Sequence, residues 1–80
     1  MPVVTKLNGV KISIFSNDHV PPHIHAHCGE HEAQINLRSM EIMHGFLPKN
    51  KHRILKDYLL DNAEELLELF YELNPNIERI

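Results

Sequence analysis

The first half of the chain alternates apolar and polar residues, which is the pattern of β-strands with one buried face. Residues 2–16 contain two such runs joined by Asn8-Gly9, the dipeptide that favours a two-residue type I′ turn. This turn pairs Leu7 with Val10, so both strands share one mainly apolar face. Residue parity then assigns to that face Val3, Thr5, Leu7, Val10, Ile12 and Ile14. We expect a β-hairpin here.

A second hairpin is predicted over residues 23–37, which alternate on both sides of Gly29-Glu30. Glycine in the first position fits a type II′ turn. The resulting register pairs Ile24 with Ile35 on the core face. On the opposite, polar face it pairs three sets of residues, namely His23 with Asn36, His25 with Gln34 and His27 with Glu32. The two consecutive prolines Pro21 and Pro22 place residues 17–22 in a loop between the hairpins.

From Pro48 onward the apolar period changes from two to about 3.6 residues, the period of a helix. The apolar positions of this region are Ile54, Leu55, Tyr58, Leu59, Ala63, Leu66, Leu67, Phe70 and Leu73. Asn62, with Glu65 three residues later, fits the cap of a second helix, and one continuous helix is the alternative. The pattern predicts an α+β fold, with a mainly antiparallel sheet of about four strands and one or two carboxy-terminal helices packed on one face.

Length and composition restrict the class of protein. A chain of 80 residues builds one core, so residues 1–80 are predicted to form a single domain, with strands at about 2–37 and a helical region at about 48–74. A hydrophobic content of 42% and a charged content of 24% are typical of a globular protein. One cysteine, Cys28, excludes an internal disulfide, and no segment has the composition of a signal peptide or membrane span. We expect a cytoplasmic protein without membrane contact.

The net charge of −3 is unevenly distributed. Residues 48–56 carry four basic and no acidic side chains, whereas residues 57–80 carry seven acids and one arginine. Lys49, Lys51 and Arg53 are candidate ligand-binding residues, because the exposed N–H groups of a helix start favour an anion. The alternative is that these basic residues bind no ligand and only form a solvated first turn of the helix. The basic patch is too small for general nucleic-acid affinity but leaves RNA open as a partner. The acidic helix face formed by Glu64, Glu65, Glu68 and Glu72 is either a solubilising surface or a surface that binds a basic partner.

Histidine is the unusual residue of this composition, with seven in 80 positions. Histidines two residues apart on one strand face lie about 6.5–7 Å apart, close enough to share one ion. His19, His23 and His25 are therefore candidate ligands of a divalent metal such as zinc. Together with Asp18 they are also candidate catalytic residues for general acid–base hydrolysis, including RNA cleavage. The alternative is a solvated sheet face on which the histidines are structural.

The segment Ser16–His25, with the sequence SNDHVPPHIH, resembles the small bacterial family known as domain of unknown function 4160. Gly45-Phe46 and residues 62–67 also fit that family, so the resemblance covers nearly the whole chain. It implies an uncharacterised protein encoded beside a second small protein, for which toxin–antitoxin modules have been suggested. The positions that match the family motif are Asp18, His19, His23 and His25.

Three function classes follow from these observations. The first is a component of a toxin–antitoxin-like module that binds the small neighbouring protein, and RNA in addition, through the segment Asp18–His25. The second is a histidine-cluster metal-binding protein or a hydrolase of ribonuclease type. The third is an interaction domain whose histidines are structural. The open edges of so small a sheet also allow a homodimer.

Overall fold

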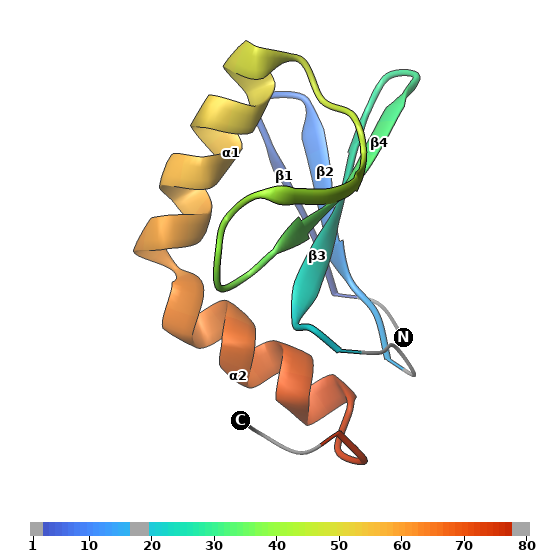
Figure 1. Cartoon of the computed structure of the whole chain (residues 1–80), viewed down its shortest axis with the longest axis vertical. Coiled ribbons are helices and arrows are strands. Elements are labelled where there is room, and N and C mark those ends of the chain that lie inside the picture. Colours follow the sequence, from blue (N-terminus) through green and yellow to red (C-terminus); the bar gives the residue numbers. More distant parts are fainter. Residues whose placement is uncertain (1–2, 17–19, 78–80) are drawn as a thin grey trace.

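The computed structural model describes residues 3–16 and 20–77, which form an antiparallel sheet with helices on one face (Figure 1). The described strands are β1 (Val3–Leu7), β2 (Val10–Ile14), β3 (His23–Cys28), β4 (His31–Asn36) and β5 (Ile42–Gly45), and the helices are α1 (Lys49–Asp61) and α2 (Ala63–Leu73). Each strand pairs with its neighbour in the chain, in the order β1-β2-β3-β4-β5. The predicted α+β class is confirmed, with one strand more than expected.

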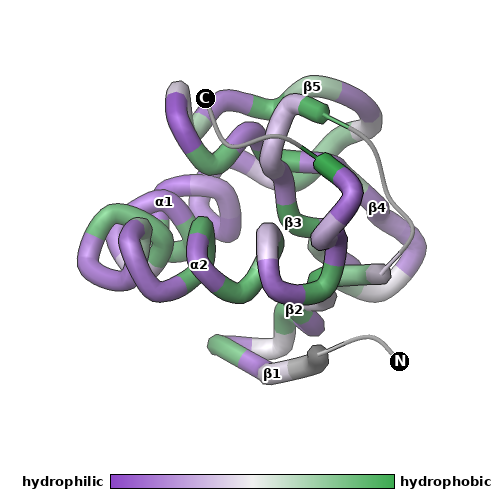
Figure 2. Tube along the Cα trace, turned by 90° about the horizontal axis from the view of Figure 1, so that it is seen from below, coloured by the Kyte–Doolittle hydropathy of each residue, from purple (hydrophilic) through white to green (hydrophobic). Residues whose placement is uncertain are grey.

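Both predicted hairpins have the predicted register. Leu7 faces Val10 across a turn in which Asn8 and Gly9 have φ of 48° and 80°, as a type I′ turn requires. In the second hairpin Cys28 faces His31, and Gly29 has a φ of 58°. Figure 2 shows β1 and β5 at the two opposite edges of the sheet.

The additional strand, β5, returns to β4 after a tight turn. The side-chain oxygen of Asn36 accepts hydrogen bonds from the backbone N–H groups of Arg38 and Ser39, at 2.7 and 3.1 Å. β5 then pairs with β4 and ends at Gly45, whose φ is 84°. A Cβ atom at this position would lie 2.0 Å from the carbonyl oxygen of Glu32. Glycine is thus required where β5 closes onto β4.

The helical region is divided at Asn62, as one of the two alternatives predicted. The predicted capping role of Asn62 was wrong, since no side-chain hydrogen bond caps the start of α2. The Asn62 amide donates instead to the carbonyl oxygen of Tyr58, at 2.9 Å, on the preceding helix. The two helices meet at a bend at Asn62, so α2 runs in a different direction from α1 (Figure 1).

The core lies between these two helices and one face of the sheet. Ile12, Ile24 and Ile35 of the strands and Leu59 and Phe70 of the helices are at most 2% exposed. At the end of α2 the buried Asn74 amide donates to the carbonyl oxygens of Phe70 and, from across the molecule, Phe15. No helix within the described ranges is both long enough and apolar enough to cross a membrane.

Candidate functional site

The face of the sheet opposite the helices carries two rows of polar side chains that run across the strands. One row is formed by Ser13, His25, Gln34 and His44, each paired with the next on the neighbouring strand. The second row is formed by Lys11, His27 and Glu32. We call the surface formed by these seven residues the histidine face.

His23 belongs to the same side of β3 but does not lie in solvent. The prediction that His23 points away from the core was wrong, and so was the alternative of a solvated face at this position, because the side chain is only 1% exposed. Its Nδ1–H donates to the carbonyl oxygen of Pro21 at 2.7 Å, and its ring centroid lies 5.9 Å from that of Phe70 in α2. His23 therefore fixes the proline loop against the end of α2.

His25 is half-buried and packs between two rings. Its centroid is 4.6 Å from that of Phe15, in an edge-to-face arrangement, and 5.1 Å from that of His23. Such ring pairs contribute about 0.5–1.5 kcal/mol beyond the apolar area that they bury. Phe15, His25, His23 and Phe70 thus form a continuous series of ring contacts from the end of β2 to α2.

A shallow polar hollow of about 240 Å³ opens on the histidine face. It is lined by His25, Glu32, Ala33, Gln34, His44 and Gly45. His25 and His44 flank Gln34 on the two adjacent strands, so the hollow presents two imidazoles and one amide. His44 was not among the predicted site residues, because β5 was not predicted.

Asp18 and His19, two of the four candidate catalytic residues, lie outside the described residues. Within residues 3–16 and 20–77 no three His, Cys, Asp or Glu side chains are grouped so that they could hold a metal ion. The proposed zinc ligands His23 and His25 are adjacent, as predicted. Because His23 Nδ1–H is bonded to Pro21, a metal at this residue would have to bind through Nε2.

The basic residues at the start of α1 have separate surroundings. Lys51 Nζ donates to the carbonyl oxygen of Asn8 at 2.7 Å and so ties α1 to the first hairpin turn. A ring N–H of His52 donates to the carbonyl oxygen of Met40, at 3.2 Å. Lys49 and Arg53 are exposed, and no side-chain hydrogen bond caps α1. Lys51, one of the three candidate anion ligands, therefore has a structural contact.

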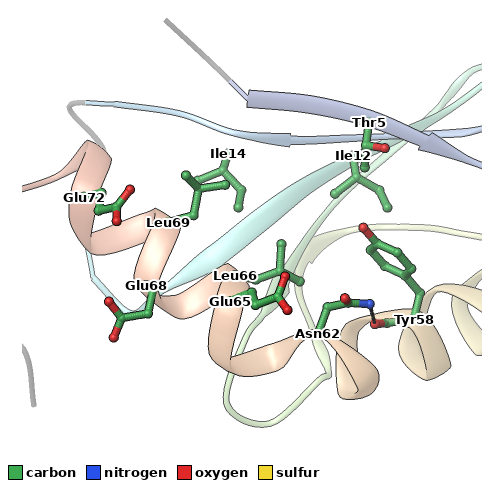
Figure 3. A pocket seen from close by; sticks show the side chains of 10 residues that line it. All are labelled: Thr5, Ile12, Ile14, Tyr58, Asn62, Glu65, Leu66, Glu68, Leu69 and Glu72. Carbon is green, nitrogen blue, oxygen red and sulfur yellow. Dashed lines mark hydrogen bonds between the residues drawn. The ribbon is translucent and has the colours of Figure 1, made fainter.

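A larger opening lies on the other face of the sheet, between its β1 edge and the helices (Figure 3). This groove has a volume of about 510 Å³ and is lined by Thr5, Ile12, Ile14, Tyr58, Asn62, Glu65, Leu66, Glu68, Leu69 and Glu72. Its floor is apolar, whereas three glutamates of α2 line one side (Figure 3). We call it the acidic groove.

The helical contribution to the acidic groove follows a simple spacing. Tyr58 lies in α1 and Asn62 at the bend, and Glu65, Leu69 and Glu72 follow at intervals of four and three residues, so these last three form one stripe of α2. This stripe borders the buried one and mixes apolar with acidic residues. It is the sequence signal that could have indicated the groove, although only the positions of β1 and β2 show that the stripe is uncovered.

Comparison with known proteins gives a family but no further relative. A family model described as "Domain of unknown function (DUF4160)" matches residues 9–70. Neither the curated proteins nor the solved structures contain a match. The matched range includes the ring series and the residues of the acidic groove other than Thr5 and Glu72. Because the match covers well over half of the sequence, the chain belongs to this family of domain of unknown function 4160.

Proposed function

We propose that the protein is the partner-binding component of a toxin–antitoxin-like module and that it binds a small partner protein in the acidic groove. The observation that carries this proposal is the groove itself, an opening of about 510 Å³ with an apolar floor. An apolar depression beside charged residues has the arrangement of a protein interface, which surrounds an apolar centre with a polar margin.

The contacts of the histidines support binding over catalysis. A general base must reach the proton of its substrate, within about 2.6–3.2 Å. His23 is 1% exposed and donates to Pro21, while His25 packs against Phe15 and His23. These two histidines therefore contribute to the position of the loop that joins the hairpins. The proposal keeps the segment Asp18–His25 as a second contact of the partner.

Coexpression with the protein encoded beside this chain tests the proposal. We expect a complex that elutes as one species in size-exclusion chromatography with light scattering. Leu69→Glu, which places a charge in the groove, should abolish the complex. Leu60→Glu is the matched control, since Leu60 is 55% exposed on α1 and does not line the groove. Absence of a complex, or equal effects of both variants, would contradict the proposal.

The same preparations test the remaining parts of the proposal. Growth arrest by the chain alone identifies it as the toxic member, and relief of the partner's toxicity identifies it as the antitoxin. Unchanged growth in both cases contradicts a toxin–antitoxin role. A mass of twice 9.3 kDa for the chain alone indicates the homodimer instead. A ribonuclease-sensitive absorbance at 260 nm identifies bound RNA.

A histidine-based hydrolase of ribonuclease type is the second candidate function. The hollow on the histidine face favours it, because His25 and His44 flank one site, where one imidazole can accept a proton and the other donate one. Cleavage of a labelled RNA oligonucleotide should then fall at least about 100-fold in His44→Ala. His31→Ala is the control, since His31 lies outside the hollow. No cleavage by the unaltered chain would exclude this candidate for RNA.

Metal binding is tested separately on untagged protein. If His19, His23 and His25 hold zinc, metal analysis should find close to one equivalent, and His25→Ala should lose it. His27→Ala, an exposed neighbour on the same strand, should keep the metal. Less than a tenth of an equivalent, with no affinity on titration, would overturn the zinc hypothesis.

A further inference from the structure

The helices leave one flank of the sheet without a helical cover. A helix is about 10 Å across and strands are about 4.8 Å apart, so one helix covers about two strands. α1 and α2 are joined end to end at a bend and do not pack side by side, so they do not cover the five-stranded sheet from edge to edge (Figure 1). The acidic groove lies where this cover ends, and Thr5 of β1 is exposed there.

The stripe that faces the groove has the spacing of a helix–helix seam. Intervals of four and three residues give a mean period of 3.5, which keeps one side of a helix toward a neighbouring helix. Tyr58 projects from α1 toward Thr5 and Ile12, and Leu69 of α2 lies opposite Ile14 (Figure 3). A helix placed beside α2 would thus insert its apolar side chains between the stripe and β1.

The charge of this region specifies the charge of that helix. Residues 57–77 contain no Lys or Arg and six acids, which are Asp57, Asp61, Glu64, Glu65, Glu68 and Glu72. Glu65 and Glu72 line the groove two helical turns apart, about 10.5 Å along the axis. The side chain of Glu68 points away from the strands (Figure 3). An occupant that meets Glu65 and Glu72 therefore needs two basic residues seven positions apart.

We propose that the acidic groove binds a cationic amphipathic helix of the partner protein, which lies beside α2 and extends the helical cover towards β1. The proposal rests on the partner-binding function. The apolar face of the bound helix packs on Ile12, Ile14 and Leu69, and its Lys or Arg residues meet Glu65 and Glu72. Recognition of an amphipathic helix by an apolar groove is a recurring mode of peptide binding.

A synthetic helix tests this occupant directly. The probe is a fluorescein-labelled peptide of 18 residues with leucines along one face and lysines at positions i and i+7 beside them. We expect saturable binding to the full chain by fluorescence anisotropy. Binding should weaken at least tenfold with Glu65→Lys in the chain. Glu64→Lys should change it less than twofold, because Glu64 lies in the same first turn of α2 but outside the groove.

Two further peptides separate the named occupant from others. A peptide with its leucines replaced by serine keeps the charge and should lose binding, which excludes a purely electrostatic contact. A peptide with glutamates in place of the lysines should also lose it. In NMR spectra of the ¹⁵N-labelled chain, the active peptide should shift the amides of Thr5, Leu66 and Leu69. Equal losses with Glu64→Lys and Glu65→Lys, or shifts outside the groove, would overturn the proposal.

The complex with the neighbouring protein distinguishes failure of this inference from failure of the proposed function. If no complex forms, the proposed function fails. If Leu69→Glu abolishes the complex while Glu65→Lys and Glu72→Lys leave its affinity within twofold, the groove binds the partner but not through a cationic helix. Loss of the complex in all three variants, with Glu64→Lys unaffected, supports both proposals.

Discussion

The histidine face and the acidic groove lie on opposite faces of one sheet and differ in how their side chains are used. The histidine side holds the residue types most often found in catalysis, yet His23 and His25 are engaged in contacts with the loop, with Phe15 and with each other. The groove is made of ordinary leucine, isoleucine and glutamate but stays open. Residue type alone is thus a poor guide to a binding surface, because the packing around a residue decides what it can contact.

A large effect on stability is expected at Gly45, which lines the hollow of the histidine face. Gly45→Ala should lower the free energy of unfolding by at least about 2 kcal/mol, because its Cβ would overlap the Glu32 carbonyl at a φ of 84°. Gly29→Ala should lower the free energy of unfolding by about 1 kcal/mol. Its φ of 58° would strain an alanine, but the added Cβ would have no other atom within 4 Å. Urea denaturation followed by circular dichroism measures both. Equal losses would mean that β5 does not close tightly on β4.

The next effect tests whether the motif histidines are structural. His23→Ala should destabilise the protein by about 2 kcal/mol, because it removes a buried ring and its hydrogen bond to Pro21. His27→Ala should stay within about 0.5 kcal/mol, since its ion pair with Glu32, at 3.9 Å, is exposed. The same denaturation measurement applies. If the two variants are equally stable, His23 does not support the fold, and a functional role of His23 is favoured over a structural one.

Two leucines that line the groove differ in burial, and their replacement separates stability from binding. Leu66 is 9% exposed, so Leu66→Ala should cost about 2–4 kcal/mol. Leu69 is half-buried in the groove, so Leu69→Ala should lower the free energy of unfolding by only about 1 kcal/mol. The same change should weaken binding of the partner at least fivefold. Isothermal titration with the purified partner gives the affinity. A Leu69→Ala variant that binds normally would mean that the groove is only an imperfection of packing.

The smallest effect has the opposite sign. Glu72 lies in the last turn of α2, where a negative charge opposes the helix dipole, and that turn has no basic residue. Glu72→Lys should therefore raise stability by about 0.3–1 kcal/mol, whereas Glu64→Lys in the first turn should lower it by a similar amount. Thermal melts would show this pair of shifts. If Glu72→Lys is more stable but binds the partner at least tenfold more weakly, this acid favours recognition at the expense of stability.

The hairpins could be predicted from the sequence because their information is local. Asn8-Gly9 and Gly29-Glu30 set the turns, and strict alternation then sets every pair of the two registers. β5 was missed because four residues beside a bulge carry no clear alternation. It is placed by the Asn36 turn and by Gly45, which signal a return of the chain rather than a strand.

The candidate site was predictable only in part. Parity correctly assigned His25 and His27 to one face, but it cannot say how far the helices reach. His23 is buried because Phe70 and the end of α2 extend to that part of β3, which no local pattern contains. The groove depends in the same way on the distance between β1 and the helices. Contacts between segments far apart in the chain therefore account for what was missed.

The order of the strands has a consequence for how the chain acquires its structure. Each strand pairs with the preceding one, so the sheet can grow by successive short loops, a topology whose local contacts favour rapid folding. The helices that cover its apolar face come after all five strands in the chain. During synthesis Ile12, Ile24 and Ile35 are made well before Leu59 and Phe70. We therefore expect the growing chain to expose an aggregation-prone surface until α2 has left the ribosome.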